Sequence, residues 1–259
     1  MNALTRRYML GCIAGASALA GCASDSTTSA QFDQVTTDGT SLIIKLETAE
    51  GVDELSVIDP DGTAFSTIEA TAGQTRYNVE LGTAYTPGEY EINAIVDEEI
   101  AATTTMALRP DIEIIDAGVG ENYPDRMPDS LGQTKGVECY VDIRNTGSGA
   151  TAVQKLLFDG GVPNPTDENE SSGIYDANSG GGEIEQVTIE SKEEKRIFSS
   201  PLPFSFEGNG VDCESEPNNG KAVVRIELSN LPESTATYEI KYTGSDSYDG
   251  CTPEIEGDE

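Results

Sequence analysis

Histidine and tryptophan are absent from this 259-residue chain, and aromatic residues make up only 6% of it. Without an imidazole, the chain cannot form a Ser-His-Asp triad, a Cys-His dyad, or a zinc or haem site with a histidine ligand. Basic residues are also scarce: 15 Lys and Arg stand against 47 Asp and Glu, for a formal net charge of −32. Because nucleic-acid binding needs basic side chains at the phosphates, this charge argues against a nucleic-acid partner.

The acidic charge is spread evenly along the chain. Residues 31–110 contain 15 acidic and 3 basic residues, and residues 111–259 contain 31 and 10. At ordinary salt such a charge would strain a compact fold by self-repulsion, whereas at molar salt the Debye length falls to about 3 Å. An evenly acidic, lysine-poor chain resembles the proteins of salt-in halophiles, chiefly haloarchaea. The alternative is an acidic, calcium-binding surface protein.

The first 22 residues, MNALTRRYMLGCIAGASALAGC, combine an export motif with a lipidation motif. Arg6 and Arg7 lie in a segment that resembles a twin-arginine (Tat) signal, and the apolar run that follows is shorter than the roughly 20 residues needed to span a bilayer. Leu19-Ala20-Gly21-Cys22 resembles a lipobox. The resemblance implies a signal peptide over 1–21, lipid on Cys22 and a flexible tether over 22–30, so that the lipid would hold the protein at the outer face of the cytoplasmic membrane. An uncleaved signal anchor, or an unmodified Cys22, is the alternative.

The rest of the chain has the alternating pattern of β-strands, and no window with convincing helical spacing occurs beyond the signal. Asp59-Pro60-Asp61-Gly62 has the composition of a tight turn, for which a metal site at the two aspartates is the less favoured interpretation. Short strands separated by turns predict a β-sandwich over 31–109. The expected strands there are 32–36, 42–46, 52–58, 64–68, 75–81, 89–96 and 101–108.

The segment Tyr85-Thr86-Pro87-Gly88-Glu89-Tyr90 resembles a corner between the two sheets of Ig-like and fibronectin-like domains. That resemblance covers residues 31–109 and implies that Tyr90, Ile92, Ala94 and Val96 point inward. Arg109-Pro110-Asp111 is the expected domain junction, because proline lacks an amide donor and holds the preceding residue extended.

The second half is predicted to form another sandwich over 110–259, ending in an acidic C-terminal tail. A strand over 137–144 leads into Asn145-Thr146-Gly147-Ser148-Gly149, and this RNTGSG region resembles the CARDB-type, Ig-like domains of prokaryotic surface proteins. The whole chain is similar to haloarchaeal secreted lipoproteins whose role is undefined. The fold class is therefore expected to be all-β, with two tandem Ig-like domains. Another strand is expected to begin at Ile112. Five more are expected over 152–158, 185–189, 194–199, 222–228 and 235–242.

Three cysteines remain beyond the signal and lipobox. Cys139 alternates with apolar neighbours, so we expect it on a buried face as a free thiol. Strands 222–228 and 235–242 should form a hairpin whose paired residue numbers add up to about 464–466, and continuing this ladder would bring Cys213 opposite Cys251 as a disulfide. Pairings through Cys139, or three free thiols, are the alternatives. Asn169 begins an Asn-Glu-Ser sequon and is a candidate glycosylation site.

No nucleophile elbow and no phosphate-binding loop occur in the sequence, so we expect no catalytic residue, metal or cofactor. The favoured function is a non-enzymatic binding, adhesion or envelope-interaction module whose partner is a protein or a glycan. The loops at the ends of such sandwiches commonly bind partners. The alternative is an accessory or solute-binding subunit of a membrane transport complex.

Overall fold

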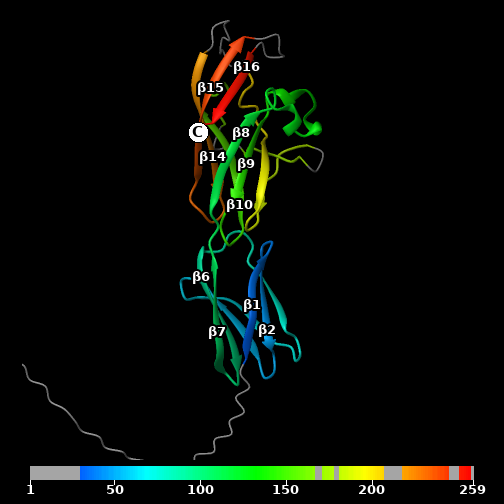
Figure 1. Ribbon diagram of the computed structural model, residues 1–259, viewed down its shortest axis with the longest axis vertical. Helices are drawn as coiled ribbons and strands as arrows, with labels where there is room; N and C mark the ends of the chain where they lie inside the picture. Colours follow the sequence, from blue (N-terminus) through cyan, green and yellow to red (C-terminus); the bar gives the residue numbers. More distant parts are fainter. Residues whose placement is uncertain (1–29, 167–170, 178–180, 207–217, 245–250, 258–259) are drawn as a thin grey trace, which may run out of the picture.

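The computed structural model describes residues 30–166, 171–177, 181–206, 218–244 and 251–257. These residues form two β-sandwiches stacked end to end along the long axis of the molecule (Figure 1). Each sandwich has its own hydrophobic core: one is drawn from residues between Ala30 and Leu108, the other from residues between Ala117 and Ile255. The fold is therefore all-β with two tandem Ig-like domains, as the sequence predicts. No helix within the described ranges is long and apolar enough to cross a membrane.

The first sandwich packs a three-stranded sheet, in the order β1-β2-β5, against a four-stranded sheet, in the order β4-β3-β6-β7. All pairings are antiparallel. All seven strands expected from the alternating pattern are present. Their bounds are β1 Gln31–Asp38, β2 Ser41–Thr48, β3 Glu54–Ile58, β4 Ala64–Glu69, β5 Arg76–Glu80, β6 Gly88–Val96 and β7 Glu99–Leu108.

Tyr90, near the start of β6, fixes the corner that leads into this strand. Its side chain is fully buried, and its hydroxyl donates a hydrogen bond of 3.0 Å to the carbonyl of Thr86. A tyrosine that binds backbone a few residues upstream in this way fixes the entry of the strand into the sheet. Ile92 and Ala94 are buried as predicted, whereas Val96 is only half-buried because the strand there reaches the end of the core.

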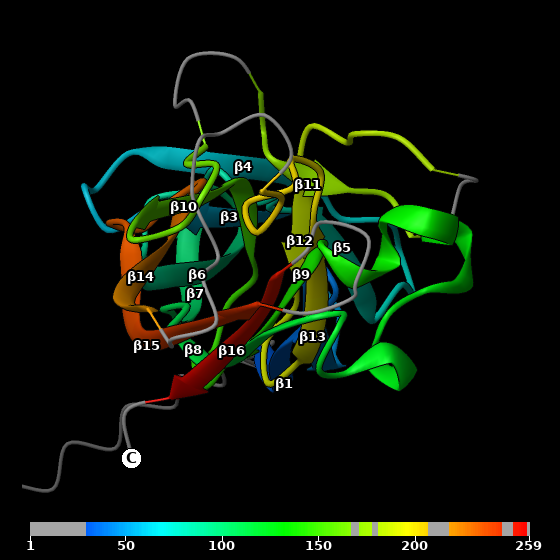
Figure 2. The ribbon, with the colours of Figure 1, turned by 90° about the horizontal axis from the view of Figure 1, so that it is seen from above.

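The second sandwich packs a five-stranded sheet, in the order β12-β10-β14-β15-β16, against a four-stranded sheet, in the order β11-β13-β9-β8. Looking down the long axis, Figure 2 shows β15 and β16 passing close to β8. The strand bounds are β8 Ile112–Val119, β9 Cys139–Asn145, β10 Thr151–Gly160, β11 Ile174–Tyr175, β12 Val187–Ile189, β13 Glu194–Ser199, β14 Asn218–Leu228, β15 Ser234–Gly244 and β16 Cys251–Gly257.

The C-terminal segment differs from the predicted acidic tail, because residues Cys251–Gly257 form the edge strand β16. Cys251, Pro253 and Ile255 are buried while the intervening residues described are not, which is a period-two pattern. The two glutamates and the proline of this strand obscured the pattern in the sequence. Proline is compatible with an edge strand, which needs hydrogen bonds on one side only.

The predicted hairpin is confirmed as β14 and β15, but its register is not the expected one. Asn218 pairs with Tyr242 and Ile226 with Ser234, so paired numbers add up to 460. After β15 the chain folds back and forms a third strand, β16. Its first residue, Cys251, pairs with Gly244 at the end of β15. The ladder of this hairpin therefore does not bring Cys251 opposite Cys213 as predicted, because Cys251 lies on β16 and does not continue β15.

A segment between β8 and β9 lies outside the two layers. This covering segment, residues 120–138, contains two short 3-10 helices, η1 (Pro124–Arg126) and η2 (Asp129–Gly136). No element was expected over 120–136, and the strand expected over 137–144 begins only at Cys139. Figure 2 shows it beside the sheet that contains β8, β9 and β13.

Candidate functional site

The junction between the sandwiches is organised by the junction loop, residues 145–149. The side chain of Asn145 is fully buried, and its Oδ1 accepts backbone amides from Asp111 (3.1 Å) and Gly147 (2.9 Å). Its Nδ2 donates to the carbonyls of Gly149 (2.7 Å) and Glu190 (3.0 Å). One amide group therefore ties the junction loop both to the connection between the domains and to the β12–β13 turn.

Hydrogen bonds from both sandwiches meet across this junction. Tyr85 Oη donates to the carbonyl of Ala150 at 2.8 Å, and Ser148 Oγ donates to the carbonyl of Ala107 at 2.7 Å. A third bond runs from Ser229 Oγ to the carbonyl of Thr83. Burial raises the pKa of Tyr85 well above its ordinary value, so the phenol remains a neutral donor. The two domains thus share polar contacts at several points, which favours a fixed relative orientation.

Gly147 allows the junction loop to approach the interdomain connection. A Cβ atom at this position would lie 2.2 Å from the carbonyl oxygen of Arg109 and 2.5 Å from the amide nitrogen of Asp111. Both neighbours are backbone atoms, which cannot rotate away. Close packing therefore requires glycine at position 147, the first glycine of the RNTGSG motif.

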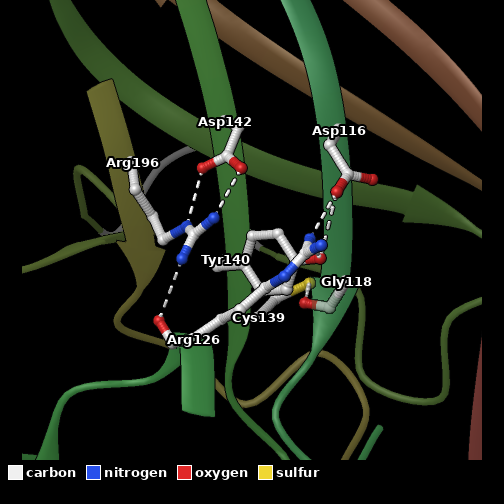
Figure 3. Close-up of polar contacts among 7 residues, drawn as sticks. All are labelled: Asp116, Gly118, Arg126, Cys139, Tyr140, Asp142 and Arg196. Carbon is white, nitrogen blue, oxygen red and sulfur yellow. Dashed lines mark hydrogen bonds and ion pairs between the residues drawn. The ribbon is translucent and has the colours of Figure 1, made fainter. Parts of the chain in front are cut away.

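A second polar cluster lies on the outer face of the β11-β13-β9-β8 sheet (Figure 3). In the antiparallel register, Asp142 of β9 lies between Arg196 of β13 and Asp116 of β8. Two carboxylates directly opposite each other repel, so this register is unfavourable unless each has its own cationic partner. The structure supplies two such partners.

Arg196 forms a two-pronged ion pair with Asp142, with Nε–Oδ1 and Nη2–Oδ2 distances of 2.7 Å each. Arg126, from η1 in the covering segment, places Nη1 2.6 Å from Oδ2 of Asp116. Arg196 also donates from Nη1 to the carbonyl of Arg126, at 3.4 Å. The two arginines neutralise the opposed aspartates and bind the covering segment to the sheet.

Tyr140 lies between these two guanidinium groups. Its ring centre is 5.1 Å from the Cζ atom of Arg126 and 4.6 Å from that of Arg196, distances typical of cation–π contacts. Its hydroxyl donates to Asp116 Oδ2 at 3.1 Å and accepts a hydrogen bond from Arg126. A Cβ atom on Gly118 would lie 2.6 Å from the Tyr140 hydroxyl oxygen, so the ring needs glycine beneath it.

The interactions in this cluster are structural, because they hold the covering segment against the sheet. Burial, followed by the nearby charge of Asp116, raises the pKa of Tyr140 well above its ordinary value, so the phenol does not ionise near neutral pH. The carboxylates bind the arginines, which leaves no activated nucleophile or base at this position. Exposed ion pairs contribute about 0–1 kcal/mol each, so the two-pronged, less exposed Arg196–Asp142 pair is the stronger of the two.

Of the residues singled out in the sequence, Cys139 is found where predicted. It is a free thiol, fully buried, with Sγ 3.1 Å from the carbonyl oxygen of Gly118. Cys251 is buried and disulfide-bonded. The pairing with Cys213 stays a prediction, because that residue lies outside the described part of the chain.

The residues of the predicted N-terminal anchor, Arg6, Arg7 and Cys22, also lie outside the described residues, as does the sequon asparagine Asn169. These predictions therefore rest on the sequence motifs alone.

Asp59 behaves as a turn residue. Its Oδ1 accepts the backbone amides of Asp61 (3.0 Å) and Thr63 (2.8 Å), which closes the β3–β4 hairpin. These bonds use the carboxylate within the turn and bear out the prediction of a tight turn. Over the ranges that the structure describes, no group of three or more potential metal-ligating side chains comes together.

A shallow hollow of about 530 Å³ lies at the end of the first sandwich that is remote from the second. It is lined by loop residues that include Ala49, Glu50, Asp53, Ala70 and Ala72. Small apolar side chains with two exposed acids do not provide the converging polar groups that a specific small-molecule site needs.

The cluster of Arg126, Tyr140 and Arg196 was not expected from the sequence. A signal for part of it was present, because Tyr140, Asp142 and Arg144 alternate with buried residues and so share the outer face of β9. Nothing in the sequence showed that Arg126, in a segment without β pattern, would cover this face.

Comparisons with known proteins give a likeness of fold only. No protein-family model matches the chain, and no curated protein matches it. Among solved structures, a beta-glucuronidase from glycoside hydrolase family 2 is 11% identical (TM-score 0.24); the match covers 86% of this chain but only 21% of the enzyme. The BSP domain of a biofilm associated protein is 15% identical (TM-score 0.26), with coverage of 80% and 29%. A two-domain fibronectin type III segment of chicken tenascin is 13% identical (TM-score 0.26), with coverage of 80% and 95%.

Proposed function

We propose that this chain is a lipid-anchored, salt-adapted cell-surface protein that acts as a non-enzymatic binding or envelope-interaction module. The observation that carries the proposal is the hydrogen-bonded junction, in which Tyr85, Ser148 and Ser229 connect the two sandwiches. A fixed junction makes a pair of domains act as one elongated spacer. Such a spacer holds its far end away from the surface to which its near end is attached.

The N-terminal motif supplies the attachment in this proposal. Arg6 and Arg7 would direct export, and the lipid on Cys22 would hold the protein at the membrane. The first described strand begins at Gln31, at the end of the first sandwich remote from the second (Figure 1). The second sandwich would therefore lie farther from the membrane, where it can contact a protein or glycan of the envelope.

The non-enzymatic part of the proposal rests on the chemistry of the polar cluster. The side chains of Arg126 and Arg196 both contact Tyr140, and each of the two arginines binds an aspartate. This arrangement fits structural support better than catalysis, which requires a base or nucleophile free to react.

Cross-linking in intact cells tests the proposal. Full-length protein would be cross-linked in high salt with short and long reagents, next to a Cys22→Ser variant. We expect the wild type to be accessible to added protease and to form a discrete adduct with an envelope component, which the released variant does not form. Retention in the cytoplasm, or surface exposure without an adduct for any reagent, would contradict it.

A further inference from the structure

The covering segment is closed at its base by two backbone hydrogen bonds. Gly120 N donates to the carbonyl of Glu138, and Glu121 N donates to the carbonyl of Gly136, both at 2.9 Å. Above this base, Met127 and Leu131 pack on Tyr140 as a small cluster separate from the main core, with Tyr175 and Phe198 beside it. The segment thus covers an aromatic face of the sheet with few apolar contacts of its own.

A buried carboxyl lies at the base of this segment. Glu138 is only 3% exposed, and its Oε2 accepts a hydrogen bond of 3.1 Å from Ser199 Oγ on β13. Ser199 Oγ itself accepts the backbone amide of Cys139 at 2.9 Å. The carboxyl is therefore held between the covering segment and the sheet.

The contacts of the other carboxyl oxygen, Glu138 Oε1, indicate that the Glu138 carboxyl is protonated. Thr134 Oγ1 lies 3.0 Å from the carbonyl oxygen of Leu131 and 3.5 Å from Glu138 Oε1, yet a hydroxyl has one hydrogen to donate. A protonated Glu138 resolves this competition, because its O–H donates to Thr134 while Thr134 donates to Leu131. Since Thr134 lies at the surface, this chain of bonds also leads from the buried carboxyl to solvent.

The charged groups around Glu138 do not compensate an ionised carboxylate. On the covering segment, Lys135 is 3.4 Å from Asp129, and Glu121 carries a charge of the same sign as Glu138. On the sheet, Arg196 binds Asp142, and Cys139 is a buried neutral thiol whose pKa is raised by burial. Burial likewise raises the pKa of Glu138, to about 8.

We propose that the covering segment is a proton-controlled lid: a proton on Glu138 keeps residues 120–138 docked, and its loss opens them locally and exposes the aromatic face of Tyr140, Tyr175 and Phe198. An ionised Glu138 would have no cationic partner in the docked state, whereas opening returns it to water. This inference stands apart from the proposed surface function, because it concerns an equilibrium within the chain itself.

The sign of the pH dependence follows from the raised pKa. Docking holds the proton up to about pH 8, whereas the open segment releases it near the ordinary glutamate value of about 4.3. Between these limits the open state binds fewer protons, so each pH unit shifts the equilibrium about tenfold towards opening. Above about pH 8 both states are ionised, and the equilibrium no longer changes.

Hydrogen exchange of the full-length protein tests the lid. Amide exchange would be followed from pH 5 to 9 at about 1 M salt, where surface charges are screened, and corrected for intrinsic rates. We expect protection of the amides of Glu121, Val137 and Glu138 to fall with pH up to about 8 and then to level off. The amides of the β14–β15 hairpin serve as the internal reference and should keep their protection.

Two variants separate Glu138 from its surroundings. Glu138→Gln keeps a donor for Thr134 and an acceptor for Ser199, so protection of the segment should become independent of pH. Asp125→Asn, on the exposed part of the same segment, should retain the wild-type profile. The proposal fails if wild-type protection of the segment is independent of pH, if the hairpin loses protection in parallel, or if Glu138→Gln retains the wild-type slope.

Discussion

The hydroxyl of Tyr85, in the first sandwich, donates a hydrogen bond of 2.8 Å to the carbonyl of Ala150, in the second. Both groups are buried, so neither can replace the other by water. This single bond joins two segments that the sequence marked separately, the corner around Tyr90 and the strand after the RNTGSG motif.

Tyr85→Phe should loosen the junction. The variant leaves the Ala150 carbonyl without its phenol donor, and we expect a loss of about 1–2 kcal/mol in the free energy of unfolding. Chemical denaturation measures this loss, and small-angle scattering should show a broader distribution of interdomain orientations. Tyr77→Phe is the matched control, because Tyr77 Oη binds Gln74 within the first sandwich. Equal effects of both variants on interdomain orientation would contradict the role of Tyr85.

Asn145→Asp should destabilise the chain more strongly. The substitution removes the amide donor to Gly149 and Glu190 and places a carboxylate against their carbonyl oxygens. We expect a loss of about 3 kcal/mol, because a buried charge without a partner is costly. Thermal and chemical unfolding would be compared with Asn145→Ala, which lacks the donor but adds no charge. If the aspartate is no worse than the alanine, buried charge is not the cause.

Non-reducing peptide mapping should find Cys251 linked to Cys213, with Cys139 as a free thiol. In the structure, Cys251 is disulfide-bonded and Cys139 is free and fully buried. We expect Cys139 to react with alkylating reagents only after unfolding, because its thiol is buried and its pKa is raised. A linked peptide that contains Cys139 would contradict this assignment.

The anchor prediction concerns Arg6, Arg7 and Cys22. Cys22→Ser should release the protein into the medium or leave an uncleaved precursor, because the lipid attachment site is lost. Replacing both arginines with lysine should retain it in the cytoplasm. Fractionation and immunoblotting measure both outcomes, and the lipoprotein interpretation is wrong if both variants remain on membranes at wild-type size and amount.

Lower salt should destabilise the protein lacking the signal segment. From about 1 M to about 0.1 M NaCl the Debye length grows from about 3 to about 10 Å, so the repulsion among acidic side chains increases. We expect the melting temperature to fall by at least about 4 °C, the shift that 1 kcal/mol produces in a small domain. KCl at the same ionic strength should restore it as NaCl does, since charge screening depends on ionic strength. A melting temperature independent of salt would contradict salt adaptation.

All strands of the first sandwich could be predicted from the sequence, whereas β11 and β16 of the second could not. In the first, β3 and β5 alternate strictly between more buried and more exposed residues, and turns such as Asp59–Gly62 separate the short strands, so local patterns suffice. In the second, β16 carries Pro253 and two glutamates, and its role depends on pairing with β15 rather than on its own composition. The position of β16 also depends on the register of the β14–β15 hairpin. That register is set by the residues at which the turn closes, which the sequence pattern did not locate correctly.

The polar sites depended on contacts between distant segments. Asn145 was recognised as part of a motif, but its partner Glu190 lies in another turn. Arg126 meets Tyr140 because the covering segment folds over the sheet, and Glu138 looks like any other acid in an acidic chain. Burial distinguishes it, and burial of a single carboxyl is not visible in composition or periodicity.

The direction of β1 has a consequence for mechanical force. β1 begins at the end of the first sandwich remote from the junction and runs towards it, and β7 leaves that sandwich at the junction (Figure 1). Tension between Gln31 and Leu108 therefore acts along both strands. The β1–β2 bonds, from Gln31–Thr48 to Asp38–Ser41, are then loaded together in shear, instead of being broken one at a time as in peeling. A pull along the molecule thus meets the resistance of a whole ladder of hydrogen bonds.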